Sequence, residues 1–137
     1  MNLLFEIITP EKTFYKEEVD EVIVPTADGE ITILPNHIGL LTQVVSGEII
    51  VKKSNSRYSI AITSGFLEVD KNHLTLLANY AVRAESINIV KAEEAKKRAQ
   101  KLMEEKTTDK DFRIAEAELR KAILELKVGL KHKGRAN

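Results

Sequence analysis

The sequence has no cysteine and no long apolar run, and each absence excludes a group of functions. Without cysteine there is no disulfide, thiolate metal site, iron–sulfur cluster or cysteine nucleophile, which is compatible with a reducing compartment. No apolar run approaches the roughly 20 residues that a membrane-spanning helix needs. The first residues, MNLLFE, lack the basic start and apolar stretch of a signal peptide, so we expect a cytoplasmic protein.

The charges are unevenly distributed, although the 137 residues carry no net charge. Residues 1–86 hold 7 basic and 12 acidic residues, whereas the remainder holds 14 basic and 9 acidic residues. An acidic front and a basic back argue against general nucleic-acid binding. They predict an acidic partner for the back part.

Short segments rich in Ile, Val, Leu and Thr make up the first part of the chain. Breaks of Gly, Pro, Asn and Asp separate them, and these residues favour turns. Many short strands at this spacing are typical of an antiparallel sandwich or barrel. In one segment Tyr58, Ile60 and Ile62 alternate and are expected to share a face. The predicted strands are 3–8, 19–24, 30–34, 40–45, 48–53, 57–63, 66–70 and 73–79.

The composition then shifts to Ala, Lys, Glu, Arg and Leu, which predicts helices over roughly 88–105 and 109–131. Asn88 or Ser86 could cap the first helix, and Thr108 with Asp111 resembles a capping box. Apolar residues at steps of three and four predict an antiparallel hairpin. An alanine-rich seam buries little area, so the hairpin is expected to be weakly held. The seam residues are Ala92, Ala95, Ala99, Leu102, Phe112, Ala115, Leu119, Ala122, Leu126 and Leu130.

We therefore predict two domains, a β-sandwich over 1–84 and a helical hairpin over 85–137. The basic tail, residues 131–135, is expected to be a frayed and solvated end. A weak hairpin beside a firm sandwich could also be a two-state element, although a static hairpin is the simpler interpretation.

No motif for catalysis or metal binding is present. Both glycine-rich phosphate loops are missing, and the three histidines lack the i, i+4 spacing of a helical metal site. Ser64-Gly65 lacks the G-x-S-x-G elbow, which leaves a turn as its simplest role. We expect no catalytic residue, no metal and no active site, and a small hydrolase is disfavoured.

Three stretches of the chain, within residues 29–42, 64–78 and 84–88, carry motifs that resemble those of the epsilon subunit of bacterial F-type ATP synthases. Residues 29–42, GEITILPNHIGLLT, are similar to that family's G-x-x-G-I-L-P-x-H-x-P-L-x-T signature, with Thr32 and Gly39 as departures. Residues 64–69, SGFLEV, and 74–78, LTLLA, resemble its paired G-G-F-x-E-V and V-T-V-L-A strands. Residues 84–88, AESIN, lead into a hairpin like that of the family.

The resemblance implies a ten-stranded antiparallel β-sandwich followed by a two-helix antiparallel hairpin. It implies a non-catalytic rotor subunit of the central stalk, which couples ion-driven rotation of the c-subunit ring to ATP synthesis. The sandwich would bind the gamma subunit on one face and the ring at one end. The hairpin would extend towards the alpha and beta subunits and inhibit ATP hydrolysis. The location would be the cytoplasmic face of the bacterial cell membrane, peripheral and within the complex.

The resemblance also suggests contact residues in each part. In the sandwich, the motif loop supplies candidates for the ring contact: Glu30, Asn36, His37, Ile38 and Leu40. A purely structural turn is an equal alternative for this segment. In the hairpin, candidates for inhibitory basic contacts are Arg113, Arg120, Lys121, Lys127, Lys131, Lys133 and Arg135.

Some bacterial members bind ATP through an I/L-D-x-x-R-A motif, and the matching positions here are Ile87, Asn88, Lys91 and Ala92. Asn88 removes a charged acceptor, and Lys91 removes the planar donors of arginine. Val82 stands where those members carry a glutamate, and Lys121 and Glu125 stand for their second-helix arginines. We therefore expect no cofactor. ATP as a regulatory ligand, in a nucleotide-sensing module, and a generic protein-interaction adaptor stay open as alternatives.

Overall fold

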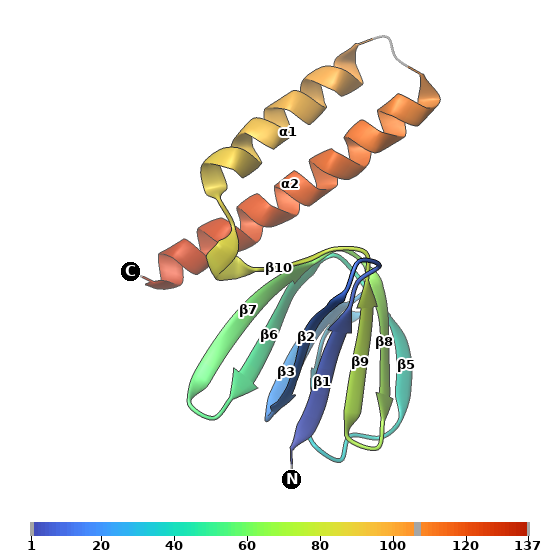
Figure 1. Cartoon of the computed structure of the whole chain (residues 1–137), viewed down its shortest axis with the longest axis vertical. Coiled ribbons are helices and arrows are strands. Elements are labelled where there is room, and N and C mark those ends of the chain that lie inside the picture. Colours follow the sequence, from blue (N-terminus) through green and yellow to red (C-terminus); the bar gives the residue numbers. More distant parts are fainter. Residues whose placement is uncertain (1, 106–107, 137) are drawn as a thin grey trace. The chain divides into compact units, whose positions relative to one another are not determined.

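The computed structural model describes residues 2–105 and 108–136 and divides into two compact units. The first ends at Arg83 and the second begins at Ala84. The first unit holds all ten strands, and the second holds a short 3-10 helix and two α-helices (Figure 1).

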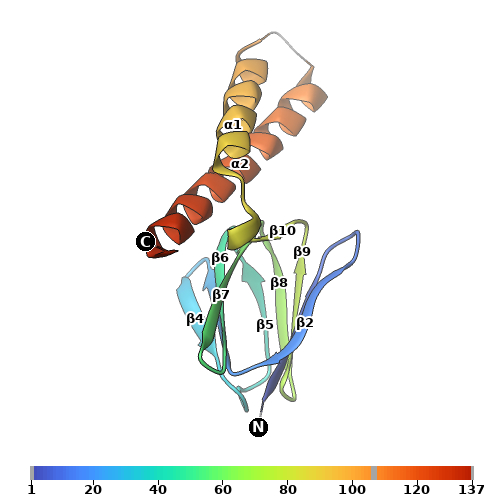
Figure 2. The same ribbon diagram turned by 60° about the vertical axis from the view of Figure 1, so that its left-hand side comes forward.

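The ten strands form one curved sheet in the order β10-β7-β6-β3-β5-β8-β9-β1-β2, and β4 pairs with β3 beside this path. Figure 2 turns β4 into view. The expected sandwich and hairpin are therefore confirmed. The strands are β1 Leu3–Ile8, β2 Thr13–Val19, β3 Glu21–Thr26, β4 Gly29–Ile33, β5 Leu40–Val44, β6 Gly47–Lys53, β7 Ser56–Ile62, β8 Gly65–Asp70, β9 His73–Ala78 and β10 Ala81–Arg83.

The sheet differs in three details from the strands that the sequence predicts. The pair β1–β9 is parallel, so the sheet is mixed and not wholly antiparallel. Segment 19–24 is divided at Asp20, since Val19 ends β2 and Glu21 begins β3. The pattern misses β2 and β10 because β2 exposes charged residues along a sheet edge and β10 is only three residues long.

Alternating side chains fill the interior of the sandwich. In β1, Leu3, Phe5 and Ile7 are fully buried, while the residues between them are half-buried. The predicted shared face of Tyr58, Ile60 and Ile62 is confirmed, because all three contribute to the core. These large side chains make the sandwich a firmly packed body.

The helical unit consists of η1 Ala84–Ser86, α1 Ile89–Glu104 and α2 Asp109–Ala136. Asn88 caps α1, because its Oδ1 accepts from the Lys91 N–H at 3.0 Å. Thr108 caps α2 through the N–H of Asp111 at 3.1 Å. The sequence predicts both caps. Because α2 continues to Ala136, residues 131–135 are helical and the predicted fraying is wrong, whereas the predicted solvation is confirmed, since four of these five residues are exposed.

Small residues form the interface between α1 and α2. The most buried of the predicted seam residues are Ala92, Ala99, Ala115 and Ala122. Leu102, Phe112 and Leu130 are exposed, so the predicted seam is wrong at its ends. From Ala115 and Ala122, the strict seven-residue step reaches Gly129 and not Leu130. A Cβ on Gly129 would come within 2.9 Å of Ile87 Cγ2, which shows how closely these segments approach.

Candidate partner-binding surfaces

A tight turn presents the loop that joins β4 to β5. The His37 N–H donates to the Leu34 carbonyl at 3.1 Å, Pro35 follows Leu34, and Asn36 has φ 67°. Proline at the second position and a left-handed third residue define a type II turn. The sequence predicts a turn here because Pro fixes φ and Asn tolerates positive φ. We call residues 34–39 the end loop.

The end loop carries an exposed apolar tip. Ile38 is 80% exposed and Leu34 is also exposed, as is Leu41 just beyond the loop in β5. His37 Nδ1 lies 2.7 Å from the Ile38 carbonyl, so the ring donates from Nδ1 and is held against the loop backbone. An exposed apolar tip on an ordered loop is a feature of binding surfaces.

The structure brings only part of the predicted ring-contact set together. Asn36, His37 and Ile38 share the end loop, whereas Glu30 lies at the start of β4 opposite Pro25. Glu30 and Leu34 are four residue steps apart along the strand, a distance of about 13 Å. Leu40 begins β5 and packs partly against the core. Glu30 therefore does not belong to the end loop, although it is neighbouring in sequence.

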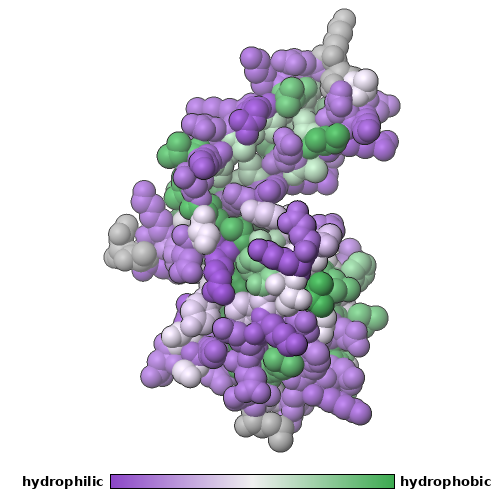
Figure 3. Space-filling model, in the orientation of Figure 1, coloured by the Kyte–Doolittle hydropathy of each residue, from purple (hydrophilic) through white to green (hydrophobic). Residues whose placement is uncertain are grey.

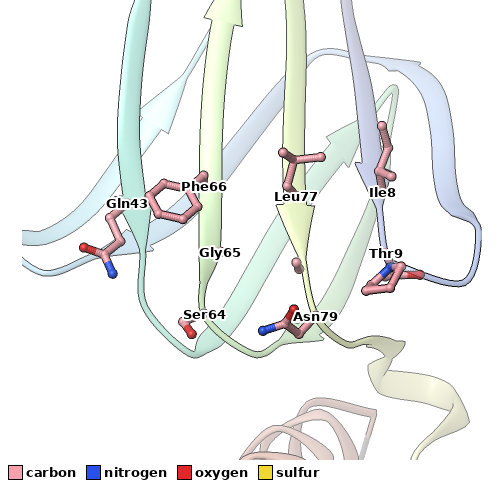
Figure 4. Close-up of a pocket in the computed structure, with 10 residues that line it drawn as sticks. Ile8, Thr9, Gln43, Ser64, Gly65, Phe66, Leu77 and Asn79 are labelled. Carbon is pink, nitrogen blue, oxygen red and sulfur yellow. The ribbon is translucent and has the colours of Figure 1, made fainter.

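An apolar row crosses the outer face of β8, β9 and β1. Register pairs place Gln43 opposite Phe66 and Phe66 opposite Leu77 in antiparallel pairs, while Leu77 faces Ile8 in the parallel one. Figure 4 shows these four side chains next to one another. Phe66 and Leu77 are 57% and 51% exposed. In Figure 3, apolar groups appear in green on this side of the sandwich. We call Phe66, Leu77 and Ile8 the apolar row.

The apolar row borders a hollow of about 370 Å³. Its rim includes Pro10, Ser64 and Asn79 from the neighbouring turns. This surface was not predicted from the sequence. The available signal was an apolar residue at a solvent-facing position in each of two adjacent strands. Only the register of the strands shows that these residues are neighbours and form a patch.

Gly65 allows two strands to approach closely beside the hollow. A Cβ at this position would lie 2.0 Å from the Leu77 carbonyl oxygen, so no side chain fits. Ser64 lies in the connection between β7 and β8, as the simpler interpretation of a turn predicts, and Gly65 at the start of β8 permits the close strand packing.

Side-chain contacts connect β2 and β10, the strands at the two ends of the sheet order. Tyr15 Oη on β2 donates to Glu17 at 3.0 Å, and Lys53 Nζ on β6 donates to the same carboxylate at 3.3 Å. The Arg83 guanidinium, at the end of β10, lies 5.6 Å from the centre of the Tyr15 ring. Burial, followed by the bond to Glu17, raises the pKa of the Tyr15 phenol. The bonds from Tyr15 and Lys53 lower the pKa of Glu17.

The hairpin has a hollow of about 390 Å³ between its helices. Lys91, Arg98 and Lys121 line it together with Glu118 and Glu125, over a floor of alanines that includes Ala92. The structure thus brings two positions of the predicted nucleotide motif, Lys91 and Ala92, to the same hollow as Lys121 and Glu125. The oxygen of Asn88 is already engaged in capping α1, and Ile87 packs near Gly129.

Six of the seven predicted basic contacts lie along one side of α2. At 3.6 residues per turn, five of them fall opposite Ala115 and Ala122, Lys121 lies at the edge of this side next to the hollow, and Lys133 falls on the seam side. All seven are exposed, and Arg120 also pairs with Glu116 at 3.2 Å. We call the six the basic stripe: Arg113, Arg120, Lys121, Lys127, Lys131 and Arg135.

The described part of the chain has neither a membrane-spanning helix nor a cluster of metal-binding side chains. No helix there is long and apolar enough to cross a membrane. No group of three or more His, Asp or Glu residues within the same ranges is arranged to hold a metal ion.

The fold and its surfaces define a class of protein in which a β-sandwich carries a helical hairpin. Residues 2–84 match the family model described as ATP synthase, delta/epsilon chain, beta-sandwich domain. Residues 85–129 match the model for the long alpha-helix domain of the same chain. The chain belongs to the ATP synthase delta/epsilon chain family, as the resemblance in its motifs predicts.

Two relatives match over nearly their whole length. The ATP synthase epsilon chain of Dehalococcoides mccartyi is 41% identical over 132 residues, which is 96% of this chain and 94% of the relative. That of Chloroflexus aggregans is 37% identical over 97% of this chain and 96% of its own. A chain in the Euglena gracilis mitochondrial ATP synthase has a TM-score of 0.68 at 17% identity, covering 99% of this chain and 82% of that chain. This last similarity concerns the fold.

Proposed function

We propose that this chain is the epsilon subunit in the central stalk of a bacterial F-type ATP synthase. It is a structural subunit of the rotor, without an active site of its own. It couples rotation of the c-subunit ring to ATP synthesis, and its hairpin inhibits ATP hydrolysis. The observation that carries the proposal is the division into a firmly packed sandwich and an alanine-joined hairpin, in a chain that matches the family throughout.

The apolar row is the surface that we assign to the gamma subunit. A stable contact between rotor subunits needs apolar area that water leaves on binding. Phe66 and Leu77 provide such area beside a hollow that can receive a partner side chain. Phe66→Glu should abolish binding to the gamma subunit in pull-down experiments. Glu68→Gln, an exposed neighbour on the same strand, is the matched control, and binding that survives Phe66→Glu would remove this face from the contact.

The end loop is the surface that we assign to the ring of c-subunits. Its apolar tip, Ile38, would pack against the ring, while His37 would pair with polar groups there. Glu30 lies about 13 Å away along β4, so it would contact the ring at a point separate from the end loop. The double variant Glu30→Ala, His37→Ala should weaken attachment to the ring without unfolding the sandwich. Wild-type binding by the double variant would exclude both residues.

The basic stripe supports a charged contact of the hairpin with the alpha and beta subunits. An interface made by exposed charges is screened by salt, so inhibition of hydrolysis should weaken as ionic strength rises. Lys127→Gln should reduce inhibition, whereas Lys133→Gln, the same change on the seam side of the helix, should have little effect. Equal effects of the two variants, or inhibition that is independent of salt, would contradict the proposal.

The central experiment measures ATP hydrolysis by the assembled catalytic head with the gamma subunit. The intact chain is compared with a chain that ends after Ser86. A clear rise in hydrolysis on truncation supports inhibition by the hairpin. An unchanged rate would show that the helices do not restrain the enzyme.

The hollow between the helices supports ATP as a regulatory ligand of the same subunit. Three basic side chains line it, although Glu118 and Glu125 also face it and would repel phosphates. Titration calorimetry with ATP, with and without magnesium, measures binding directly. Binding in the micromolar range would establish a nucleotide site, and no heat would exclude one at that affinity.

Co-purification with a c-subunit ring and gamma would exclude a free-standing adaptor and support a peripheral place at the cytoplasmic face of the membrane.

A further inference from the structure

The end loop is fastened to a turn that is distant in sequence. The backbone N–H of Asn36 donates to Oδ1 of Asn72, and Asn72 Nδ2 donates to Oδ1 of Asn36 at 3.3 Å. Asn72 lies in the two-residue turn between β8 and β9, where Asp70 pairs with His73. One side chain thus makes two hydrogen bonds to the end loop across 36 residues of sequence.

The Asn72 turn is itself fixed to the sheet. Lys71 and Asn72 have φ 48° and 62°, and positive φ at both central residues of a two-residue hairpin is typical of a type I′ turn. The Asn72 carbonyl accepts from the Leu4 N–H at 2.8 Å, which ties the turn to the first strand. The side chain of Asn72 is therefore presented from a firm base.

Asparagine has two roles at both positions. Asn36 and Asn72 each adopt the left-handed conformation, which only glycine and, less readily, asparagine or aspartate take without difficulty. Glycine would satisfy both turns equally well, but it has no side-chain amide to form hydrogen bonds. The two asparagines therefore supply a cross-loop connection that the backbone conformation alone does not require.

We infer that Asn72 is a positioning residue for the ring contact, and that Asn36 belongs to the same brace instead of contacting the ring through its side chain. This inference rests on the proposed function of the end loop. The brace holds the loop so that Ile38 and His37 face a partner in one arrangement. A loop that is already ordered loses less conformational freedom when it binds.

The test compares variants that keep the backbone of the turn. Asn72→Gly retains the left-handed conformation and removes both side-chain bonds, whereas Lys71→Gly changes the adjacent left-handed residue and keeps Asn72. Each full-length chain, in complex with the gamma subunit, is measured for affinity to detergent-solubilised rings of c-subunits. Hydrogen exchange of the Asn36 amide and the melting temperature are measured on the free chains.

We expect Asn72→Gly to expose the Asn36 amide to exchange and to weaken ring binding about three- to tenfold, with a melting temperature close to that of Lys71→Gly. Lys71→Gly should bind like the wild type. Asn36→Gly should have a smaller effect than Asn72→Gly, because its N–H can still donate to Asn72. Unchanged ring affinity in Asn72→Gly, or an Asn36 amide that stays protected, would overturn the brace.

Ile38→Asp separates this inference from the proposed function. If Ile38→Asp binds the ring normally, the end loop is not the ring contact and the brace proposal falls with it. If Ile38→Asp loses binding while Asn72→Gly does not, the ring contact stands and only the brace is wrong. Loss of binding in both, with Lys71→Gly unaffected, supports both proposals.

Discussion

The sandwich and the hairpin bury different kinds of side chain. Phe, Leu, Ile and Val fill the sandwich, and many of them are fully buried. In the hairpin, Ala92, Ala99, Ala115 and Ala122 are buried together with only two larger side chains among the described residues, Leu124 and Val128, while Leu102, Ile123 and Leu130 remain exposed. Since stabilisation scales roughly with the apolar area removed from water, a contact between alanines contributes far less than one between leucines.

The difference separates two mechanical roles within one chain. A closely packed core transmits force and has one arrangement. An interface of small side chains can be exchanged for another at a cost of a few kcal/mol, which is the range in which a ligand or partner can shift a two-state equilibrium. Paired variants in the two units test this contrast.

The same truncation in the two units should have very different costs. Leu74→Ala in the sandwich should lower the free energy of unfolding by about 2–5 kcal/mol, because it leaves a cavity in a filled core. Leu126→Ala removes a half-buried side chain of the hairpin and should cost less than half as much. Urea unfolding followed by circular dichroism measures both values. Similar costs would show that the hairpin is as firmly held as the sandwich.

Overpacking gives a second contrast. Gly65→Ala should destabilise the sandwich by about 2–3 kcal/mol, because the new Cβ meets the Leu77 carbonyl. Gly134→Ala, on α2, meets no atom within 4 Å and should leave the stability unchanged or raise it slightly. Thermal unfolding of the two variants provides the comparison. A Gly65→Ala protein as stable as the wild type would mean that the two strands can separate without cost.

Removing a helix cap should affect the hairpin alone. Asn88→Ala should destabilise α1 by about 1 kcal/mol, since the Lys91 N–H loses its acceptor. Asn88→Asp keeps an acceptor and is the control. Hydrogen exchange resolved by residue should show faster exchange along α1 and no change in the sandwich. Faster exchange in both units would indicate that they unfold together.

Acid should weaken the sandwich through Glu17, and this is the smallest of the four expected effects. Its pKa is lowered from an ordinary value of 4.5, so its stabilising bonds are present above that value and are lost as the pH falls through the lowered pKa. Glu17→Gln should therefore show a shallower loss of stability below about pH 4.5. Glu18→Gln changes the adjacent carboxylate and is the control. Identical pH profiles for Glu17→Gln and the wild type would contradict the assignment.

Local signals in the sequence predicted most of the fold. Alternation identified the buried faces, turn residues marked most strand ends, and Asn88 and Thr108 marked the helix starts. The pattern failed where a strand is an exposed edge, as in β2, and where a strand is very short, as in β10. It also passed over Gly129, because a pattern of apolar residues favours the neighbouring Leu130.

The candidate surfaces were less accessible from sequence. The motif located the end loop, but it also included Glu30, which a strand of five residues carries away from the loop. The apolar row was missed, because Phe66, Leu77 and Ile8 become neighbours only through the register of three strands. The basic stripe was predicted as a set of residues, and the length of α2 then arranged six of them on one side.

The sequence by itself determined the two units, the turn at Pro35 and Asn36, and the alanine seam, because each depends on residues within a few positions of one another. Only the tertiary structure brought Asn72 to Asn36 and assembled the apolar row. It also closed Arg83 over Tyr15. Such contacts join segments tens of residues apart, and no local preference encodes which strand will lie beside which.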